Sequence, residues 1–359
     1  MFNYVDFIIA FLIAGITTFL ATYLVKKFAV KIGAVDFPNH RKIHTIIKPR
    51  LGGIAIFIGS FFGTLYIHPF HEHLPEILLG AIVILITGAM DDLYNIRPVI
   101  KLSGQLIAAS FLISDGLIIE RVTLPIVGMV DLGFASVLIT VLWVVGITNA
   151  INLIDGLDGL ATGVTAIAFL SMFVMAIIDG QYVAAVLCVV FIGANIGFLF
   201  HNFYPATIYM GDAGSNLLGY MIAVVSMLGL FKNIALLGFI IPMIVLAIPI
   251  FDTLYAIVRR AHQKENIMAA DNKHIHYRLM ENGYSHRKSV LIIYAFSALF
   301  GAMAVMFSNS SLILSFVITV FVLILLHLLA EVSGLVLNGK RPVLNTLHKI
   351  FLRKQRGKE

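Results

Sequence analysis

Charged residues are scarce in this chain, and cysteine is almost absent. Only 12 % of the 359 residues are Asp, Glu, Lys or Arg, whereas 60 % are hydrophobic. A soluble domain carries about 25 % charged and about 45–50 % apolar residues, so the composition argues against a water-soluble protein. The single cysteine, Cys188, lies in an apolar run and excludes an internal disulfide. The composition therefore predicts a chain that is solvated by lipid.

The sequence also lacks a basic stripe interleaved with aromatic residues, although its formal net charge is +6. The charges lie in short patches between apolar runs, as loops beside an anionic bilayer would carry them. The lipid bilayer is therefore an expected partner, and nucleic acid is not. The first apolar run has no preceding basic segment and no small-residue cleavage site, so it is predicted to be a membrane span rather than a signal peptide.

Apolar runs long enough to cross a membrane, which requires about 20 residues, recur along the chain. They predict an all-α polytopic membrane protein with about eleven transmembrane helices. We expect residues 1–337 to form one integral-membrane domain and residues 338–359 a basic tail. The expected spans are 4–25, 51–67, 77–90, 102–119, 132–149, 160–178, 182–200, 214–231, 234–258, 290–307 and 311–337, and residues 120–131 are expected to form a short external hairpin.

The distribution of positive charge predicts the orientation of these spans, because cytoplasmic loops are enriched in Lys and Arg. If the N-terminus is outside and the loop 26–50 is cytoplasmic, 23 of the 25 Lys and Arg residues lie on the cytoplasmic side. Only Arg121 and Lys232 lie outside. The pattern predicts a multi-pass protein of the inner (cytoplasmic) membrane with a cytoplasmic C-terminus.

Acidic and amide residues gather in the predicted cytoplasmic loops, close to the span ends. A carboxylate inside a membrane costs about 2.5–3.5 kcal/mol on insertion scales, so such groups are retained mainly for ions, protons or substrates. Several on one face would repel each other unless cations bound there, and oxygen ligands suit Mg²⁺, with Mn²⁺ as the alternative. The residues concerned are Asp91, Asp92, Asn152, Asp155, Asp158 and Asp212.

Basic residues in the same loops indicate a phosphate-bearing substrate, since Lys and Arg bind phosphoryl groups. Taken singly, each motif also fits a solvated loop or a helix start, with Asp212 for example as an N-cap. Asp252, near the inner end of the span 234–258, is expected to pair with Arg259 or Arg260. These residues together predict an enzyme that uses a divalent cation and acts on a phosphate-bearing substrate. This prediction requires all the polar loops to lie on one side of the membrane.

Together the motifs resemble those of the polyprenyl-phosphate N-acetylhexosamine-1-phosphate transferase family, over roughly residues 33–288. Asp91-Asp92 is similar to its acidic pair, residues 149–159 (NAINLIDGLDG) to its NxxNxxDGxDGL signature, and residues 210–215 to its metal-binding MGDxGS motif. Residues 49–53 (PRLGG) and 274–279 (HIHYRL) resemble the branch that uses UDP-N-acetylglucosamine (UDP-GlcNAc). That branch usually has His where this chain has Tyr277, so no catalytic role is expected for Tyr277.

The resemblance implies a transfer of N-acetylglucosamine-1-phosphate from UDP-GlcNAc to undecaprenyl phosphate, with release of UMP. The product would begin a cell-envelope glycan such as teichoic acid or the O-antigen of lipopolysaccharide. The resemblance implies that Asn152 and Asp212 bind Mg²⁺, and that Asp158 contacts uracil. It implies catalytic roles for Asp91, Asp92, Asp155 and His276, and substrate-binding roles for Asp158, His274, Arg278, Lys42, His44 and Lys48.

Several alternatives stay open from the sequence. The donor could instead be UDP-muramoyl-pentapeptide, as in the phospho-MurNAc-pentapeptide transferase of peptidoglycan synthesis. A proton-coupled transporter usually has mid-membrane charges and repeated halves, neither of which is visible here, and a non-catalytic scaffold would leave the acidic cluster unexplained. Direct transfer and a covalent aspartyl-phosphate route are both compatible with the sequence. A homodimer is also compatible with the sequence. The sequence does not determine which glycan is initiated, which hexosamine epimer is transferred, or whether Asp91 or Asp92 is the base.

Overall fold

The computed structural model describes residues 4–36, 47–124, 128–229, 240–264, 274–308 and 310–333. Within these ranges the chain is a helical bundle with two small antiparallel sheets, which confirms an all-α polytopic membrane protein. The number of eleven spans and the orientation remain predictions. Seven helices are long and apolar enough to cross a membrane: α1 (Tyr4–Ile32), α3 (Leu74–Tyr94), α5 (Ala135–Ile154), α6 (Leu160–Ile178), α7 (Tyr182–Asn202), α12 (His286–Ser308) and α13 (Leu312–Ser333).

Most expected spans correspond to a single helix, including the shorter α2 (Gly52–Ile67) and α4 (Pro98–Ser114) and the central α8 (Gly211–Gly229). The expected span 234–258 differs. Its described part is divided at Leu246 into α9 (Ile240–Val245) and α10 (Ala247–Gln263). Pro249 explains the break, because it has no N–H to donate to the carbonyl of Val245 and its ring clashes with that carbonyl.

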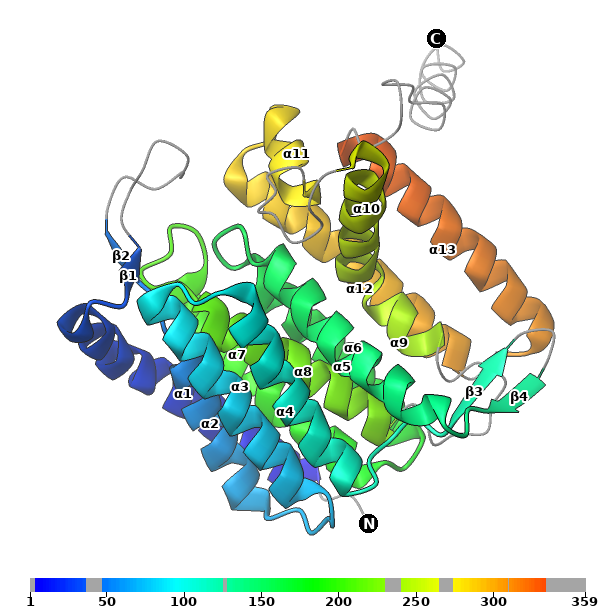
Figure 1. Cartoon of the computed structure of the whole chain (residues 1–359), viewed down its shortest axis with the longest axis horizontal. Helices are drawn as coiled ribbons and strands as arrows, with labels where there is room; N and C mark the ends of the chain where they lie inside the picture. Colours follow the sequence, from blue (N-terminus) through cyan, green and yellow to red (C-terminus); the bar gives the residue numbers. More distant parts are fainter. Residues whose placement is uncertain are drawn as a thin grey trace.

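Helix α8 occupies the middle of the bundle, where α2, α3, α5, α6 and α7 pack around it (Figure 1). Every residue of α8 except Asp212 is buried. Helix α3 approaches α8 closely at Gly88, where a Cβ atom would lie 2.6 Å from the carbonyl oxygen of Asp212. On the other side, Trp143 of α5 donates a hydrogen bond of 2.9 Å to Ser226 of α8. Helix α8 is therefore held against α3 at its first turn and against α5 near its last turn.

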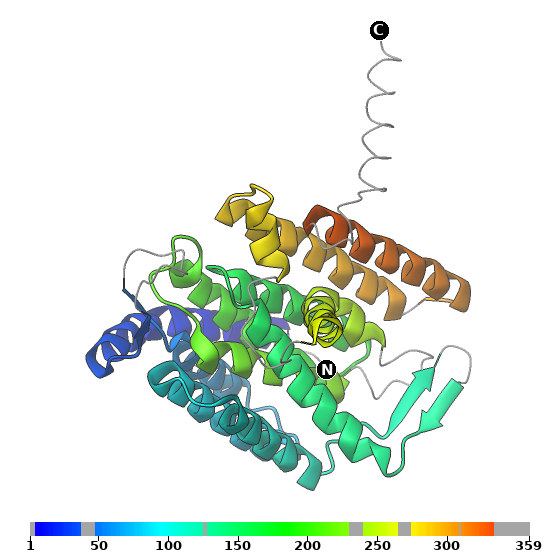
Figure 2. The ribbon, with the colours of Figure 1, turned by 45° about the horizontal axis from the view of Figure 1, so that its top comes forward.

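The two sheets lie at opposite ends of the bundle (Figure 1). Strands β1 (Val35–Asp36) and β2 (Lys48–Pro49) pair at the end that also carries α11 (Ile275–Glu281). Strands β3 (Arg121–Leu124) and β4 (Gly128–Asp131) form the hairpin predicted for residues 120–131. Helix α12 packs against α6 and α9, and α13 packs against α12, so this pair flanks the central helices (Figure 2).

Candidate active site

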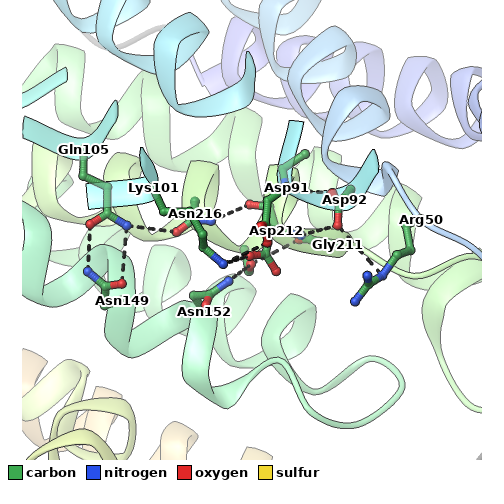
Figure 3. A network of polar contacts seen from close by, with 12 residues as sticks. Arg50, Asp91, Asp92, Lys101, Gln105, Asn149, Asn152, Gly211, Asp212 and Asn216 are labelled. Atoms are coloured by element: carbon green, nitrogen blue, oxygen red, sulfur yellow. Dashed lines mark hydrogen bonds and ion pairs between the residues drawn. The ribbon is translucent and has the colours of Figure 1, made fainter. Parts of the chain in front are cut away.

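Two carboxylates from different helices share one ammonium group at the β1–β2 end of the bundle (Figure 3). Lys101 Nζ, in the first turns of α4, lies 2.9 Å from Asp91 Oδ2 at the end of α3. It also contacts Asp212 Oδ2 at the start of α8. The predicted convergence of Asp91 and Asp212 is thus confirmed. Lys101 was predicted only as one of the cytoplasmic positive charges, although a lone Lys at the start of an apolar helix was a signal in its own right.

Asp92 performs a different task from its neighbour Asp91. Its Oδ1 accepts a hydrogen bond of 2.9 Å from the backbone N–H of Asp212, and its Oδ2 accepts one of 3.0 Å from Ala213. A carboxylate is favoured at a helix N-terminus because the first N–H groups of the helix lack partners there. Gly211 makes room for it, since its φ is +72° and a Cβ atom would strike the Asp92 carboxylate. Asp92 therefore caps α8 and fixes the position of Asp212.

Asn152 joins the same cluster from α5 (Figure 3). Its Nδ2 donates a hydrogen bond of 2.8 Å to Ser215 Oγ, and Ser215 in turn donates to the carbonyl oxygen of Gly211. The Asn152 amide is thereby held beside the first turn of α8, which also carries Asp212. The three residues whose convergence the sequence predicted, Asp91, Asn152 and Asp212, thus meet at one place.

Three amide side chains, Gln105, Asn149 and Asn216, lie beside this cluster and are hydrogen-bonded to one another (Figure 3). Asn149 Nδ2 donates to Gln105 Oε1 at 2.8 Å, and Gln105 Nε2 contacts Asn216 Oδ1 at 3.3 Å. Asn216 Nδ2 then donates to the carbonyl oxygen of Asp212 at 2.7 Å. The amides tie α4, α5 and α8 together. Asn149 belongs to the motif at residues 149–159, whereas Gln105 and Asn216 were not predicted, because single amides in apolar helices form no sequence pattern.

Negative charge accumulates around the first turn of α8. Burial, reinforced by the charges of Asp212 and Asp92, raises the pKa of Asp155 to about 8. Arg50 Nε lies 3.9 Å from Asp92 Oδ1 and so offsets part of this charge. Arg50 was predicted to be a cytoplasmic positive charge within the PRLGG motif, and no acidic partner was predicted for it. The cluster therefore has more acidic than basic groups and favours the binding of a further cation.

The donor set fits a Mg²⁺ or Mn²⁺ ion. All the candidate ligand atoms are carboxylate or amide oxygens, which these ions prefer. The ammonium group of Lys101 lies between Asp91 and Asp212, which shows that this position attracts a cation. In the described part of the chain, no three His, Cys, Asp or Glu side chains are grouped closely enough to hold an ion by themselves. An ion here would accordingly need the Asn152 amide oxygen and oxygens from a substrate.

Asp158 and Lys48 form the rim of the cluster next to the loop after α7. Asp158 Oδ2 accepts a hydrogen bond of 2.8 Å from the backbone N–H of Ala206 and lies 3.5 Å from Lys48 Nζ. The same ammonium group lies 5.0 Å from the centre of the Tyr209 ring. This corner presents a carboxylate, an ammonium group and an aromatic ring together. The contact of Asp158 with uracil remains a prediction.

Helix α11 brings the predicted histidines to the turn after α5. The ring of His276 lies against Gly156, and the side chain is 1 % exposed. Neither of its ring nitrogens has a hydrogen-bond partner among the described residues. Burial lowers the pKa of His276 to about 3, so the ring is neutral. Arg278 is partly exposed on the same helix, and the catalytic or binding roles predicted for these residues, and for His274, remain predictions.

Lys42 and His44, predicted to bind phosphate, lie outside the described residues. The basic tail 338–359 lies outside them as well.

The fold and the site define a polytopic membrane protein with a buried cluster of oxygen ligands at one end. Residues 74–230 match the family described as Glycosyl transferase family 4. A similar protein, the probable undecaprenyl-phosphate N-acetylglucosaminyl 1-phosphate transferase of Bacillus subtilis, is 43 % identical over 337 residues, which cover 93 % of this chain and 94 % of that protein. The chain therefore belongs to glycosyl transferase family 4.

Two further relatives carry related names. A decaprenyl-phosphate N-acetylglucosaminephosphotransferase of Mycobacterium tuberculosis is 35 % identical, over 83 % of this chain and 82 % of that protein. An undecaprenyl-phosphate alpha-N-acetylglucosaminyl 1-phosphate transferase of Salmonella typhi is 29 % identical, over 86 % of this chain and 85 % of that protein. The similarity covers nearly the whole bundle rather than one motif.

Proposed function

We propose that this chain transfers N-acetylglucosamine-1-phosphate from UDP-GlcNAc to undecaprenyl phosphate at the cytoplasmic face of the inner membrane. An oxygen of the lipid phosphate attacks the sugar-linked phosphorus, the bond from that phosphorus to the bridging oxygen of UMP breaks, and UMP leaves. The products are undecaprenyl-diphospho-N-acetylglucosamine and UMP. The relatives named above are similar over most of their length, which supports the reaction class.

The observation that carries the proposal is the meeting of Asp91, Asn152 and Asp212 at one end of an apolar bundle. A lipid phosphate stays at the headgroup level, whereas a nucleotide sugar arrives from water. A cluster at the helix ends is accessible to both. The same location suits a phosphoryl transfer, in which positioning and charge neutralisation supply most of the catalysis.

Asn152 and Asp212 are the residues we propose to hold Mg²⁺ or Mn²⁺. The bound ion would neutralise charge on the donor diphosphate. Lys101 contacts Asp212 and Asp91 together, so it can hold these two carboxylates in place before substrate binds and can pair with a phosphate afterwards.

Asp91 is the better candidate to orient or deprotonate the lipid phosphate. Both oxygens of Asp92 are already hydrogen-bonded to the backbone of α8. Asp91 Oδ2 instead contacts the ammonium group of Lys101, and a lysine side chain can change its conformation when a substrate binds. A phosphate monoester has a second pKa near 6, so little base strength is required. Asp155 supports the site beside these residues. The donor is bound by Asp158, Lys48, His274, His276, Arg278, Lys42 and His44.

The test is an assay of UMP release from UDP-GlcNAc by the purified protein, with undecaprenyl phosphate and Mg²⁺. We expect activity in the wild type and its loss in Asp212→Asn. The matched control is Asp131→Asn, which removes an acid of the opposite end, paired at 2.7 Å with Arg121, and should leave turnover unchanged. Full activity in Asp212→Asn would refute the role of Asp212, and release of UMP only from UDP-muramoyl-pentapeptide would refute the proposed donor.

A further inference from the structure

A buried carboxylate on α10 holds the start of α11 in two ways. Asp252 Oδ2 lies 2.9 Å from His274 Nδ1, and Asp252 Oδ1 accepts a hydrogen bond of 3.0 Å from the backbone N–H of Ile275. Asp252 is 3 % exposed and His274 is 4 % exposed. One side chain thus fixes both the backbone and the first histidine of the helix.

Helix α11 depends on such an anchor. It has only seven residues, and a helix this short is not stable in water without tertiary contacts. An acidic group at its N-terminus satisfies a free N–H and interacts favourably with the helix dipole. The position of Asp252 therefore determines where α11 lies against the rest of the bundle.

The anchor reaches the candidate active site through two histidine rings. The rings of His274 and His276 are nearly parallel, at an interplanar angle of 9° and a centroid separation of 5.9 Å. The His276 ring in turn packs on Gly156, with its Cε1 atom 2.7 Å from where a Cβ atom of that glycine would lie. Gly156 follows Asp155 directly. A shift of α11 would consequently be felt at the turn that carries Asp155 and Asp158.

The same contact defines the hydrogen-bonding state of His274. A carboxylate at Nδ1 requires that nitrogen to carry the proton, so the imidazole presents Nε2 on its opposite side. Metal-binding and catalytic histidines are commonly oriented by a carboxylate in this way. The contacts of Asp252 among the described residues are to His274 and Ile275, and none is to Asp212 or Asn152.

We propose that Asp252 is a positioning residue for the nucleotide-sugar half of the site, acting through His274 and the docking of α11 on Gly156. This inference rests on the proposed function, because it assigns α11 to the donor and not to the lipid phosphate. Loss of the Asp252 charge should weaken UDP-GlcNAc binding and leave the lipid substrate unaffected.

The experiment measures the KM for each substrate and the shift in Tm on adding UDP-GlcNAc, for purified Asp252→Asn and His274→Gln. The second variant removes the same contact from the other side while keeping the cap on Ile275. We expect the KM for UDP-GlcNAc to rise at least tenfold, about 1.4 kcal/mol, with the KM for undecaprenyl phosphate changed less than twofold. The double variant should be no worse than the more impaired single variant, because the two residues act as one unit.

Two controls separate this role from a general loss of stability. Glu331→Gln removes another buried carboxylate, which contacts His327 at 3.0 Å on α13, and should keep the wild-type KM values. Asp252→Glu retains the charge and should recover part of the donor affinity. Equal rises in both KM values, or an unchanged donor KM in His274→Gln, would overturn the inference. A wild-type protein whose Tm responds to UDP-GlcNAc but which releases no UMP would refute the proposed function alone.

Discussion

Asp91 and Asp92 are adjacent in the chain, yet the structure gives them separable roles. Asp92 is bonded to two backbone N–H groups of α8, and Asp91 is bonded to Lys101. We predict that Asp92→Asn lowers stability and activity together, whereas Asp91→Asn removes activity at nearly unchanged stability.

The magnitudes follow from the contacts. A hydrogen bond to a charged group contributes about 1.5–3 kcal/mol, and a neutral one about 0.5–1.5 kcal/mol. In Asp92→Asn one bond becomes neutral, and the new NH₂ group faces a backbone N–H, so that bond is lost. We expect the free energy of unfolding to fall by roughly 2–4 kcal/mol. Asp91→Asn keeps a neutral acceptor for Lys101, which costs about 1 kcal/mol.

The assay can use the single tryptophan of the chain. Trp143 is buried between α5 and α8 and bonded to Ser226, so its fluorescence reports the unfolding of the helix pair that carries the site. Turnover is measured in parallel as UMP release, and loss of a general base typically lowers it by about 10²–10⁴-fold. Equal stability losses in the two variants, or wild-type turnover in Asp91→Asn, would refute the assignment of capping to Asp92 and of chemistry to Asp91.

Three further predictions concern the same end of the bundle. In Lys101→Met, Mg²⁺ should raise the Tm more than in the wild type, because no ammonium group competes for Asp91 and Asp212; an equal or smaller shift would contradict this. In Gly156→Ala the new methyl group meets the ring of His276, so the KM for UDP-GlcNAc should rise. The control is Gly146→Ala in α5, where the methyl group meets no atom within 4 Å and the KM should not change. Similar KM values for the two variants would contradict the packing of His276 on Gly156. The pKa of His276 is lowered to about 3 in the folded state from an ordinary value of 6.5, so the folded protein binds fewer protons between these values, and its free energy of unfolding falls as the pH drops from 6.5 to 3. The magnitude is on the order of 5 kcal/mol, and a chemical-denaturation series should show a weaker acid dependence in His276→Gln than in the wild type.

The fold was largely predictable because lipid imposes a strong pattern on a sequence. Apolar runs of span length located most of the helices, and the hairpin at 120–131 was evident from its residues. The division of the span 234–258 into α9 and α10 was missed, since hydropathy is continuous across it. Pro249 was the available signal, and its effect on the carbonyl four residues earlier is a backbone property that a hydropathy window does not register.

The acidic residues of the site were predictable for a related reason, as ionisable groups at span ends are costly and therefore conspicuous. The different roles of these acidic residues were not predictable from the sequence. Asp91 and Asp92 have the same chemistry and differ only in the direction of their side chains, which the helix periodicity and the start of α8 determine. Lys101 and Asp252 were counted as ordinary loop or pairing residues, because their partners lie 111 and 22 positions away in the chain.

The balance of charge at the first turn of α8 connects these observations to the chemistry. Four acids, Asp91, Asp92, Asp155 and Asp212, face two cations, Lys101 and Arg50. Asp155, with a pKa of about 8, retains its proton at neutral pH, so the cluster without substrate carries at most about one excess negative charge. Burying more charge than this would be costly. A divalent ion together with an anionic donor can therefore enter with little change in the total charge, which is the condition under which a site so close to lipid can exchange its substrates.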